Sequence, residues 1–298
     1  MEELRQVAVI GTGTLGTQIC MAAANAGYKV QCFDSQEGSL DRALEKVRPR
    51  AEVSKRPPLV PLERWESCRK SIVCHSSMEK ALEGADLVIE AVPEELELKR
   101  RTWKDMGRWA PPKAILATNS SSIPVSRLEE AGGRPESSLN LHFYQPLLGM
   151  HMVDVMGGSR TAPEVFDAGV SWVRSLGCIP LTVRKELLGF CFNRVWRAVK
   201  RETLHMWAGG FVDFRDVDRA WMVFTGMDMG PFGLMDAVGL DVVYDIEMVY
   251  YQESQDPKDK PPEALLEMLK KGELGVKSGK GFYTYPDPEF GRDGFLKG

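Results

Sequence analysis

Residues 7–16 read VAVIGTGTLG, an apolar run that leads directly into a glycine-rich turn. Four consecutive apolar residues are typical of a short strand that is buried on both faces of a sheet. The three glycines follow the spacing GxGxxG, and an alanine-rich stretch that ends at Gly27 comes next. This pattern predicts a strand, a tight turn and a helix over Thr14–Ala26.

A strand, a turn and a helix in this order form a binding site for the pyrophosphate of a dinucleotide. The first glycine allows the turn, the second lets the backbone approach the phosphates, and the third lets the helix pack closely against the strand. A second apolar run, Lys29–Phe33, ends at Asp34, which lies 18 residues after Gly16. A carboxylate there accepts hydrogen bonds from the adenosine ribose and repels a 2′-phosphate. We therefore expect NAD rather than NADP, and prefer this interpretation of Asp34 to that of a plain turn aspartate. The predicted contacts are Gly11, Thr12, Gly13, Thr14, Leu15, Gly16 and Asp34.

Apolar runs alternate with helical stretches up to about residue 185. Further strands are expected at Ile72–Cys74, Leu87–Val92, Ile115–Thr118, Leu139–Phe143, Met152–Met156 and Ile179–Val183. This alternation predicts an α/β fold with an open, doubly wound and mostly parallel sheet, the Rossmann architecture. Such sheets bind ligands outside the carboxyl ends of their strands. Asp34, Glu94, residues 119–122 and His142 all lie at or just past such ends.

The stretch LHFYQPLLGMHMVDV at residues 141–155 contains a histidine and a carboxylate in two apolar runs. His142 ends the first run, and Asp154 follows 12 residues later in the second. If the runs lie side by side, the carboxylate can hold one ring nitrogen and leave the other to move protons near neutral pH. A buried carboxylate without a partner is costly, so we expect Asp154 to have one. The remaining histidines are interpreted as structural; they are His75, His151 and His205.

Strand patterns fade after residue 185, and amphipathic helical patterns replace them. Helices are expected at 189–210, 214–223, 234–238, 242–251 and 264–271. We therefore divide the chain into an NAD-binding domain with the catalytic histidine, residues 1–185, and an all-α domain, residues 186–298. The many large apolar side chains of the second domain either fill a helical core or also form a dimer interface. We favour a homodimer, with this domain also shaping the substrate cleft.

Residues 36–70 follow neither pattern well. A helix over Ser39–Val47, capped at Ser39, is expected to end before a group of four prolines, Pro49, Pro57, Pro58 and Pro61. A basic cluster lies in the same region: Arg48, Arg50, Lys55 and Arg56. The cluster is either a solvated loop or a contact for an anionic substrate tail, and the sequence leaves both open.

Composition excludes several classes of protein. The formal charge of −4 and a pI near 5.7 argue against general binding to nucleic acid or to anionic membranes. No run of residues is long enough to span a membrane, and no targeting peptide is evident. Six scattered cysteines show no spacing typical of a metal site, so we expect buried, reduced thiols in a cytoplasmic protein without a metal.

Taken together, these motifs resemble the 3-hydroxyacyl-CoA dehydrogenase family over essentially the whole chain. The markers are GTGTLG at 11–16, VIEAVPEELELK at 88–99, NSSSI at 119–123, HFYQP at 142–146, VDV at 153–155, GFCFNR at 189–194, MGPFGLMDAVGLD at 229–241 and GVKSGKGFYTY at 275–285. The first half is also similar to dehydrogenases of free 3-hydroxy acids, such as gulonate dehydrogenase (lambda-crystallin) and carnitine dehydrogenase.

The resemblance implies a role for individual residues. His142 matches the catalytic histidine that takes the proton of the 3-hydroxyl group, and Asp154 stands where the family has the glutamate that orients it. Ser121 matches a serine that hydrogen-bonds the reacting oxygen and also lies beside NAD, and Asn193 matches an asparagine that polarises the same oxygen. Further residues match positions around NAD; these are Glu94, Lys99 and Lys277. From the residues alone, Ser121 and Lys277 could instead serve as turn residues, and Asn193 could cap a loop; we prefer the functional interpretation.

Three departures from the family bear on the substrate. Asp154 is one methylene shorter than glutamate, Gln145 replaces the asparagine of HFxNP, and residues 36–70 are broken by prolines where CoA-binding members extend a helical hairpin. We expect an NAD-dependent enzyme of fatty acid metabolism that oxidises an L-3-hydroxyacyl-CoA. The alternatives are a dehydrogenase of a free 3-hydroxy acid, a non-catalytic NAD-binding protein and, last, a beta-hydroxyacid dehydrogenase that uses Lys200.

Overall fold

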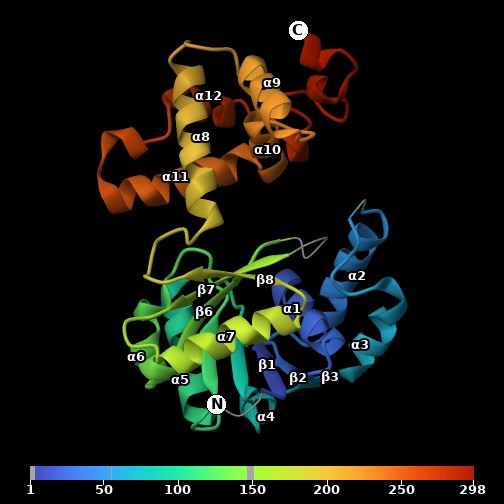
Figure 1. Ribbon diagram of the computed structural model, residues 1–298, viewed down its shortest axis with the longest axis vertical. Coiled ribbons are helices and arrows are strands. Elements are labelled where there is room, and N and C mark those ends of the chain that lie inside the picture. The colour runs from blue at the N-terminus through green and yellow to red at the C-terminus, as the bar shows by residue number, and fades with distance from the viewer. Residues whose placement is uncertain (1–3, 55, 146–150) are drawn as a thin grey trace. The chain divides into compact units, whose positions relative to one another are not determined.

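The computed structural model describes residues 4–54, 56–145 and 151–298. It divides into two compact units, Met1–Cys191 and Phe192–Gly298, which are described separately below (Figure 1). The division lies a few residues after residue 185, because the connection that follows the last strand stays with the first unit. Among the described residues, no helix is both long and apolar enough to cross a membrane.

The first unit is built on one eight-stranded sheet with the order β3-β2-β1-β4-β5-β6-β7-β8. Neighbouring strands are parallel except for β6 and β7, which are antiparallel. The predicted mostly parallel, doubly wound sheet is therefore confirmed. The strands are β1 Gln6–Ile10, β2 Lys29–Phe33, β3 Ile72–His75, β4 Leu87–Glu90, β5 Ile115–Thr118, β6 Ser138–Phe143, β7 Met152–Gly157 and β8 Ile179–Val183.

Helices cover both faces of this sheet (Figure 1). Strand β1 shows why: Val7 and Val9 enter the core beneath α1, α2, α3 and α7, whereas Ala8 and Ile10 enter the core beneath α4 and α5. Every residue of β1 is buried, which is the reason the run is apolar throughout rather than alternating. The helices are α1 Thr14–Asn25, α2 Ser39–Glu52, α3 Trp65–Ser71, α4 Met78–Leu82, α5 Leu96–Trp109, α6 Glu129–Gly132 and α7 Pro163–Ser175.

Residues 36–70 are more helical than the sequence suggested. Helix α2 continues through Pro49 to Glu52, and its N-cap is Gly38 rather than Ser39, so both expectations were wrong. Ser39 instead donates its hydroxyl to the carbonyl of Thr12, 3.0 Å away. A proline this late in a helix removes only one backbone hydrogen bond, and burial of the apolar face of α2 offsets that loss.

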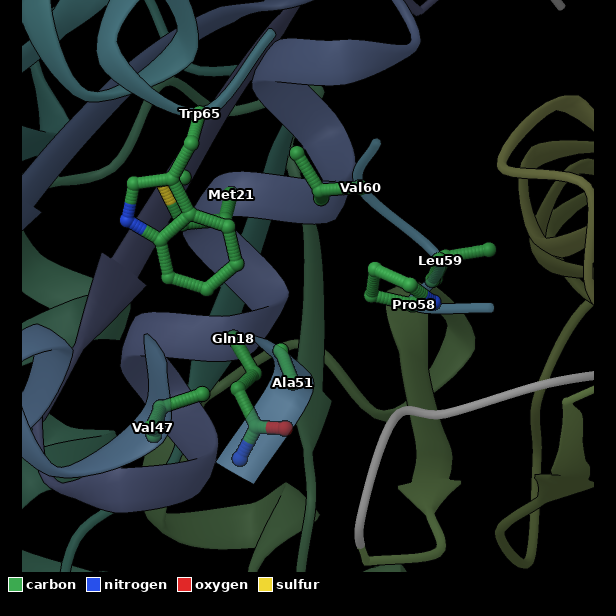
Figure 2. A pocket seen from close by; sticks show the side chains of 8 residues that line it. All are labelled: Gln18, Met21, Val47, Ala51, Pro58, Leu59, Val60 and Trp65. Atoms are coloured by element: carbon green, nitrogen blue, oxygen red, sulfur yellow. The ribbon is translucent and has the colours of Figure 1, made fainter. Parts of the chain in front are cut away.

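The segment after α2 packs back onto the first helix. Figure 2 shows Trp65, Val60 and Met21 of α1 among the side chains that line a small apolar pocket. Trp65 and Cys68 are buried and hold α3 in place, a helix that the proline-rich sequence concealed. Helix α7 was also missed, although Pro163 at its first turn is a favourable helix start.

All six cysteines are free. Four are buried as expected, but Cys74 and Cys191 are exposed. Strand β3, which carries Cys74, is the edge strand of the sheet, so the apolar run around it is covered on fewer sides than that of a central strand.

The second unit is entirely helical among its described elements, as predicted. Its core brings together Leu204, Phe232, Val243 and Tyr283 from four parts of the unit. The helices are α8 Phe192–Ala208, α9 Phe214–Thr225, α10 Pro231–Val238, α11 Leu240–Ser254 and α12 Glu263–Lys270. Short 3-10 helices complete both units at Leu62–Arg64, Val125–Arg127, Pro135–Ser137, Pro257–Asp259, Val276–Ser278, Glu289–Gly291 and Phe295–Lys297.

Candidate active site

His142 and Asp154 meet as the two apolar runs predicted. They are direct partners in the antiparallel register of β6 and β7, so both side chains project from the same face of the sheet. The imidazole Nδ1 lies 3.0 Å from the carboxylate Oδ2. The exposed fraction is 3% for His142 and 0% for Asp154. The shorter acid therefore reaches the histidine directly.

Two further groups donate to Asp154. The Tyr144 hydroxyl lies 2.5 Å from Oδ2, and the backbone N–H of Cys191 lies 3.3 Å from Oδ1. Aromatic rings enclose the imidazole: Tyr144 meets it edge-on with centroids 4.5 Å apart, and Phe190 stacks on it at 4.9 Å. Tyr144 and Phe190 were not among the predicted site residues. Tyr144 could have been found as a polar group two residues from His142, whereas Phe190 carried no signal.

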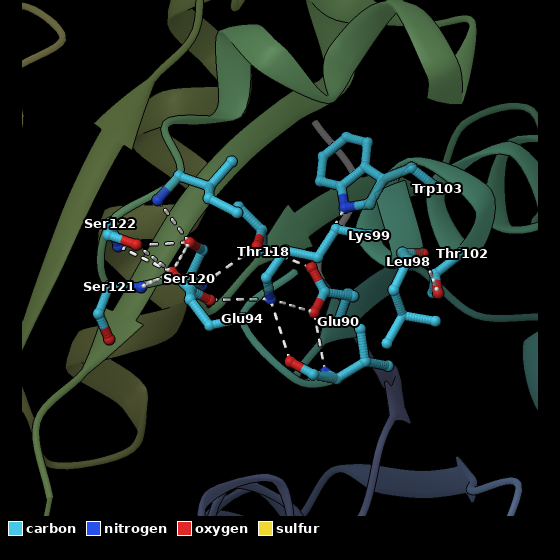
Figure 3. A network of polar contacts seen from close by, with 12 residues as sticks. Glu90, Glu94, Leu98, Lys99, Thr102, Trp103, Thr118, Ser120, Ser121 and Ser122 are labelled. Carbon is cyan, nitrogen blue, oxygen red and sulfur yellow. Dashed lines mark hydrogen bonds and ion pairs between the residues drawn. The ribbon is translucent and has the colours of Figure 1, made fainter. Parts of the chain in front are cut away.

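The loop after β5 folds around Glu94, as Figure 3 shows. One oxygen, Oε1, accepts hydrogen bonds from the Ser121 N–H at 3.1 Å, the Ser122 N–H at 2.9 Å, and the hydroxyls of Ser120 and Ser122 at 2.5 and 2.8 Å. Burial opposes ionisation of Glu94, but nearby Lys99 and the serine donors outweigh it and lower the pKa of this carboxyl. The predicted residues Glu94 and Ser121 thus lie together.

Lys99 is buried on helix α5 and joins two carboxylates. Its Nζ lies 2.7 Å from Oε1 of Glu90 and 3.2 Å from Oε2 of Glu94. Glu90, at the end of β4, also accepts a hydrogen bond of 2.8 Å from the Thr118 hydroxyl (Figure 3). Glu90 is fully buried and was missed by the sequence analysis. A carboxylate inside the apolar run LVIEAV is the same signal that identified Asp154, and it could have identified Glu90.

Asn119 connects this loop to the strand of the histidine. Its side-chain oxygen accepts a 2.9 Å hydrogen bond from the backbone N–H of Phe143, the residue after His142. Asn140 donates to the carbonyls of Thr118 and Ser120 at 3.1 and 3.2 Å. The serine loop and the end of β6 are therefore fixed to each other at one edge of the sheet.

The glycine-rich turn has the shape that a dinucleotide requires. A side chain at Gly16 would place its Cβ 1.9 Å from the carbonyl oxygen of Gly11, so α1 packs too closely for any other residue. A Cβ at Gly13 would meet nothing within 4 Å, which leaves open space beside the start of α1. Asp34 accepts a 2.7 Å hydrogen bond from the backbone N–H of Thr12, and this bond fixes the turn to the end of β2.

A pocket of about 570 Å³ opens beside this turn. Its lining includes Gly11, Gly13, Asp34 and Pro93, the residue before Glu94. The start of α1 supplies backbone N–H groups and a partial positive charge, which suit the phosphates of NAD. Thr14 and Leu15 form the first turn of α1, beside these groups. The residues present therefore fit a dinucleotide.

Two predicted residues belong to the second unit. Asn193 lies in the first turn of α8, and Lys277 lies in the 3-10 helix Val276–Ser278. The Lys277 Nζ is 2.5 Å from both carboxylate oxygens of Asp241. The roles of Asn193 and Lys277 toward substrate and cofactor stay predictions.

Comparison with known proteins identifies the family. Residues 6–187 match the description "3-hydroxyacyl-CoA dehydrogenase, NAD binding domain", and residues 189–285 match "3-hydroxyacyl-CoA dehydrogenase, C-terminal domain". The chain belongs to the 3-hydroxyacyl-CoA dehydrogenase family. It is accordingly an NAD-dependent oxidoreductase of the 3-hydroxyacyl-CoA dehydrogenase type, and its first unit contains the NAD-binding domain.

Three known proteins are similar to this one along nearly the whole chain. A probable 3-hydroxybutyryl-CoA dehydrogenase of Bacillus subtilis (strain 168) is 31% identical over 292 residues, 96% of this chain and 99% of that protein. The crystal structure of (S)-3-hydroxybutyryl-CoA dehydrogenase from Ralstonia eutropha superimposes with a TM-score of 0.85 at 27% identity, covering 96% of this chain and all of that one. A 5-formyl-3-hydroxy-2-methylpyridine 4-carboxylate 5-dehydrogenase of Mesorhizobium japonicum is 28% identical, over 95% of this chain and 91% of that protein.

Proposed function

We propose that this enzyme oxidises an L-3-hydroxyacyl-CoA, such as 3-hydroxybutyryl-CoA, to the 3-oxoacyl-CoA, or catalyses the reverse reaction. The observation that carries the proposal is the buried pair of His142 and Asp154 at the sheet edge that also holds the serine loop. Two of the similar proteins above bear the name 3-hydroxybutyryl-CoA dehydrogenase, which supports the thioester as substrate.

In this proposal His142 acts as general base. Asp154 fixes Nδ1, so Nε2 takes the proton of the 3-hydroxyl group during oxidation and returns it during reduction. The imidazolium that forms is stabilised by the carboxylate beside it. The Ser121 hydroxyl and the Asn193 amide are proposed to donate hydrogen bonds to the same substrate oxygen.

The cofactor site is proposed to comprise the turn at residues 11–16 together with Asp34, Glu94, Ser121, Lys99 and Lys277. Bound NAD would accept the hydride that leaves the third carbon of the substrate. The protein's part is to hold both reactants in place and to exclude water.

The test compares two substrates. With NAD and equal concentrations of 3-hydroxybutyryl-CoA and 3-hydroxybutyrate, we expect NADH formation from the thioester at a rate at least tenfold higher, as estimated from a few lost contacts to CoA. Absence of turnover with the thioester would overturn the proposal. NADH is followed by its absorbance at 340 nm, and the acyl products are identified by mass spectrometry. Hydrolysis of the thioester is therefore not mistaken for its oxidation.

A free 3-hydroxy acid remains the second candidate. The Mesorhizobium japonicum relative is named for a pyridine carboxylate rather than a thioester. In addition, the basic cluster near residue 50 is partly neutralised, since Arg48 lies 3.0 Å from Glu52 and 2.5 Å from Glu66. Lys55 lies outside the described residues. Turnover of the free acid at the higher rate would favour this candidate.

A homodimer in the cytoplasm is also part of the proposal. Exposed apolar side chains on the second unit support a self-association surface, with Phe224 92%, Phe211 83% and Val195 61% exposed. The expected result in sedimentation velocity is a species of twice the chain mass of 33.3 kDa. Sedimentation as a single chain at micromolar concentration would contradict it.

A further inference from the structure

We propose that Tyr144 is a positioning residue, whose hydroxyl holds the Asp154 carboxylate in the orientation in which it faces His142. This inference rests on the proposed role of His142 as general base. Tyr144 follows β6 directly, and its side chain returns to the carboxylate that pairs with the histidine.

Tyr144 and His142 share one carboxylate oxygen of Asp154. The imidazole Nδ1 is 3.0 Å from Asp154 Oδ2, and the Tyr144 hydroxyl is 2.5 Å from the same atom. Asp154 is fully buried, so no bulk water competes for that oxygen. A hydrogen bond from a neutral phenol to a carboxylate in such a site is short and strong.

The Tyr144 hydrogen bond also fixes the orientation of the Asp154 carboxylate. Aspartate is a short side chain, and its carboxylate must be fixed in rotation for Oδ2 to face the imidazole. The Tyr144 hydroxyl donates to Oδ2 and the backbone N–H of Cys191 donates to Oδ1, so each carboxylate oxygen has a donor that restricts its rotation. His142 thus meets an acceptor that is already oriented.

The same hydrogen bond affects the negative charge on the Asp154 carboxylate. A donor on Oδ2 withdraws negative charge from the oxygen that would stabilise the imidazolium of His142. Removal of the Tyr144 hydroxyl therefore changes the charge that faces His142 as well as the orientation of Asp154. Among the described residues, the titratable groups shown in contact with the ring are Asp154 on β7 and Tyr144 after β6.

Phe190 covers one face of the imidazole ring. It stacks on His142 with an interplanar angle of 26°, and its backbone has φ of 50°, a left-handed conformation that is unfavourable for a bulky residue. Such strain persists where surrounding contacts hold it. With Phe190 on its face and Tyr144 at its edge, the imidazole has little freedom to rotate away from Asp154.

The test replaces Tyr144 by phenylalanine, which retains the ring and removes the hydroxyl. We expect the NMR titration of the His142 imidazole, assigned with His142→Gln, to move to higher pH by roughly half a unit to one unit, the size of one lost hydrogen bond. The acid limb of the kcat profile for oxidation should move with it. We expect kcat to fall by about tenfold while the KM for NAD stays unchanged.

Tyr28→Phe is the matched control. It also removes a phenol hydroxyl from the first unit, one that lies 2.5 Å from Ser175 Oγ on the surface. This variant should leave both the His142 titration and the kcat profile unchanged. A second variant with 3-fluorotyrosine at position 144 keeps the size of the side chain and strengthens the donor, so the titration should move to lower pH.

The outcomes separate the two proposals. An unchanged His142 titration in both position-144 variants would overturn the role of Tyr144, whatever the activity. Opposite shifts in the two variants would support it even if Tyr144→Phe folds poorly, because the fluorinated protein retains its contacts. If the titration shifts as expected but the wild-type enzyme turns over no 3-hydroxy compound, the proposed function fails and the electrostatic role of Tyr144 stands.

Discussion

His142 on β6 faces Asp154 on β7 across an antiparallel strand pair, with 3.0 Å between Nδ1 and Oδ2. The pair lies where the sheet changes from parallel to antiparallel. Because β7 runs in the opposite direction, a residue in the middle of β7 reaches the carboxyl end of β6, the edge at which such sheets bind their ligands. The reversed strand β7 thus places Asp154 beside His142 at this edge.

Replacement of His142 by asparagine should abolish most of the catalysis. The loss of a general base typically lowers turnover by about two to four orders of magnitude. NAD binding should be unaffected, because the glycine turn and Asp34 lie on other strands. Steady-state rates and a titration of NAD by fluorescence check both expectations.

His205→Asn is the control for this change, since His205 lies in the second unit and its Nε2 lies 3.1 Å from the carbonyl of Lys258. It should retain the wild-type rate. Equal rates for His142→Asn and the wild type would remove His142 from the mechanism.

Replacement of Asp34 by alanine should weaken NAD binding. The carboxylate is expected to bind the ribose, and it also fixes the glycine turn through the Thr12 N–H at 2.7 Å. Loss of one charged hydrogen bond typically corresponds to about 1.5–3 kcal/mol, or roughly a tenfold to hundredfold increase in Kd. Calorimetric titration with NAD and NADP should also show a reduced preference for NAD.

Glu37→Ala provides the comparison, because Glu37 is an exposed acid in the same connection. It removes a nearby negative charge without freeing the turn. If both variants bind NAD like the wild type, the predicted role of Asp34 is wrong.

The sequence predicted those features that depend on local pattern. The run from Val7 to Gly16 determined strand, turn and helix because periodicity and glycine spacing are read within a few residues. His142 and Asp154 were paired correctly because burial of a carboxylate demands a partner. The hydrogen bond from Tyr144 to Asp154 depends on how the chain turns after β6, and the stacking of Phe190 on His142 joins residues 48 positions apart. Neither contact leaves a periodic signal.

Helix α2 is a case in which a local sequence signal gave a wrong prediction. Pro49 is a local signal against helix, but burial of Leu40 and Leu44 in the core offsets it. Local rules misjudge a segment when tertiary packing supplies more free energy than the broken hydrogen bond costs.

The ion pair of Glu90 and Lys99 should be important for stability, because both side chains are at most 1% exposed. Glu90→Gln leaves the ammonium group of Lys99 without its nearest charge. Because Glu94 remains 3.2 Å from Lys99 Nζ, we expect the free energy of unfolding to fall by less than the about 3–5 kcal/mol that is usual when a buried charge loses its only partner. Urea denaturation followed by circular dichroism measures the change.

The double variant Glu90→Leu/Lys99→Met serves as the control, since replacing both charges by apolar groups avoids an unpaired buried charge. It should be more stable than Glu90→Gln. A double variant that is less stable than the single one would show that the surrounding hydrogen bonds of Thr118 and Trp103, rather than the ion pair, hold this region together.

The contribution of Asp218 to the stability of the second unit should increase as the pH falls from 6 towards 4. Burial raises the pKa of the Asp218 carboxyl to about 6, although the backbone N–H groups of Phe232 and Gly233 and the Tyr283 hydroxyl donate to it. In the unfolded chain this group has its ordinary pKa of 3.8. Between these two values the folded state binds more protons than the unfolded state, so stability declines as pH rises.

The size of this effect follows from the two limits. Below pH 3.8 the group is protonated in both states, and above pH 6 it is ionised in both, so its contribution changes only within that window. The expected slope approaches about 1.4 kcal/mol per pH unit, the free energy of one pKa unit.

Urea denaturation of the full chain at several pH values, compared with Asp218→Asn, isolates the contribution, because the variant lacks the titrating group. Asp228→Asn, an exposed aspartate of the same unit, should keep the wild-type slope. If Asp218→Asn also keeps it, another buried acid such as Asp236, whose pKa burial also raises, is responsible for the pH dependence.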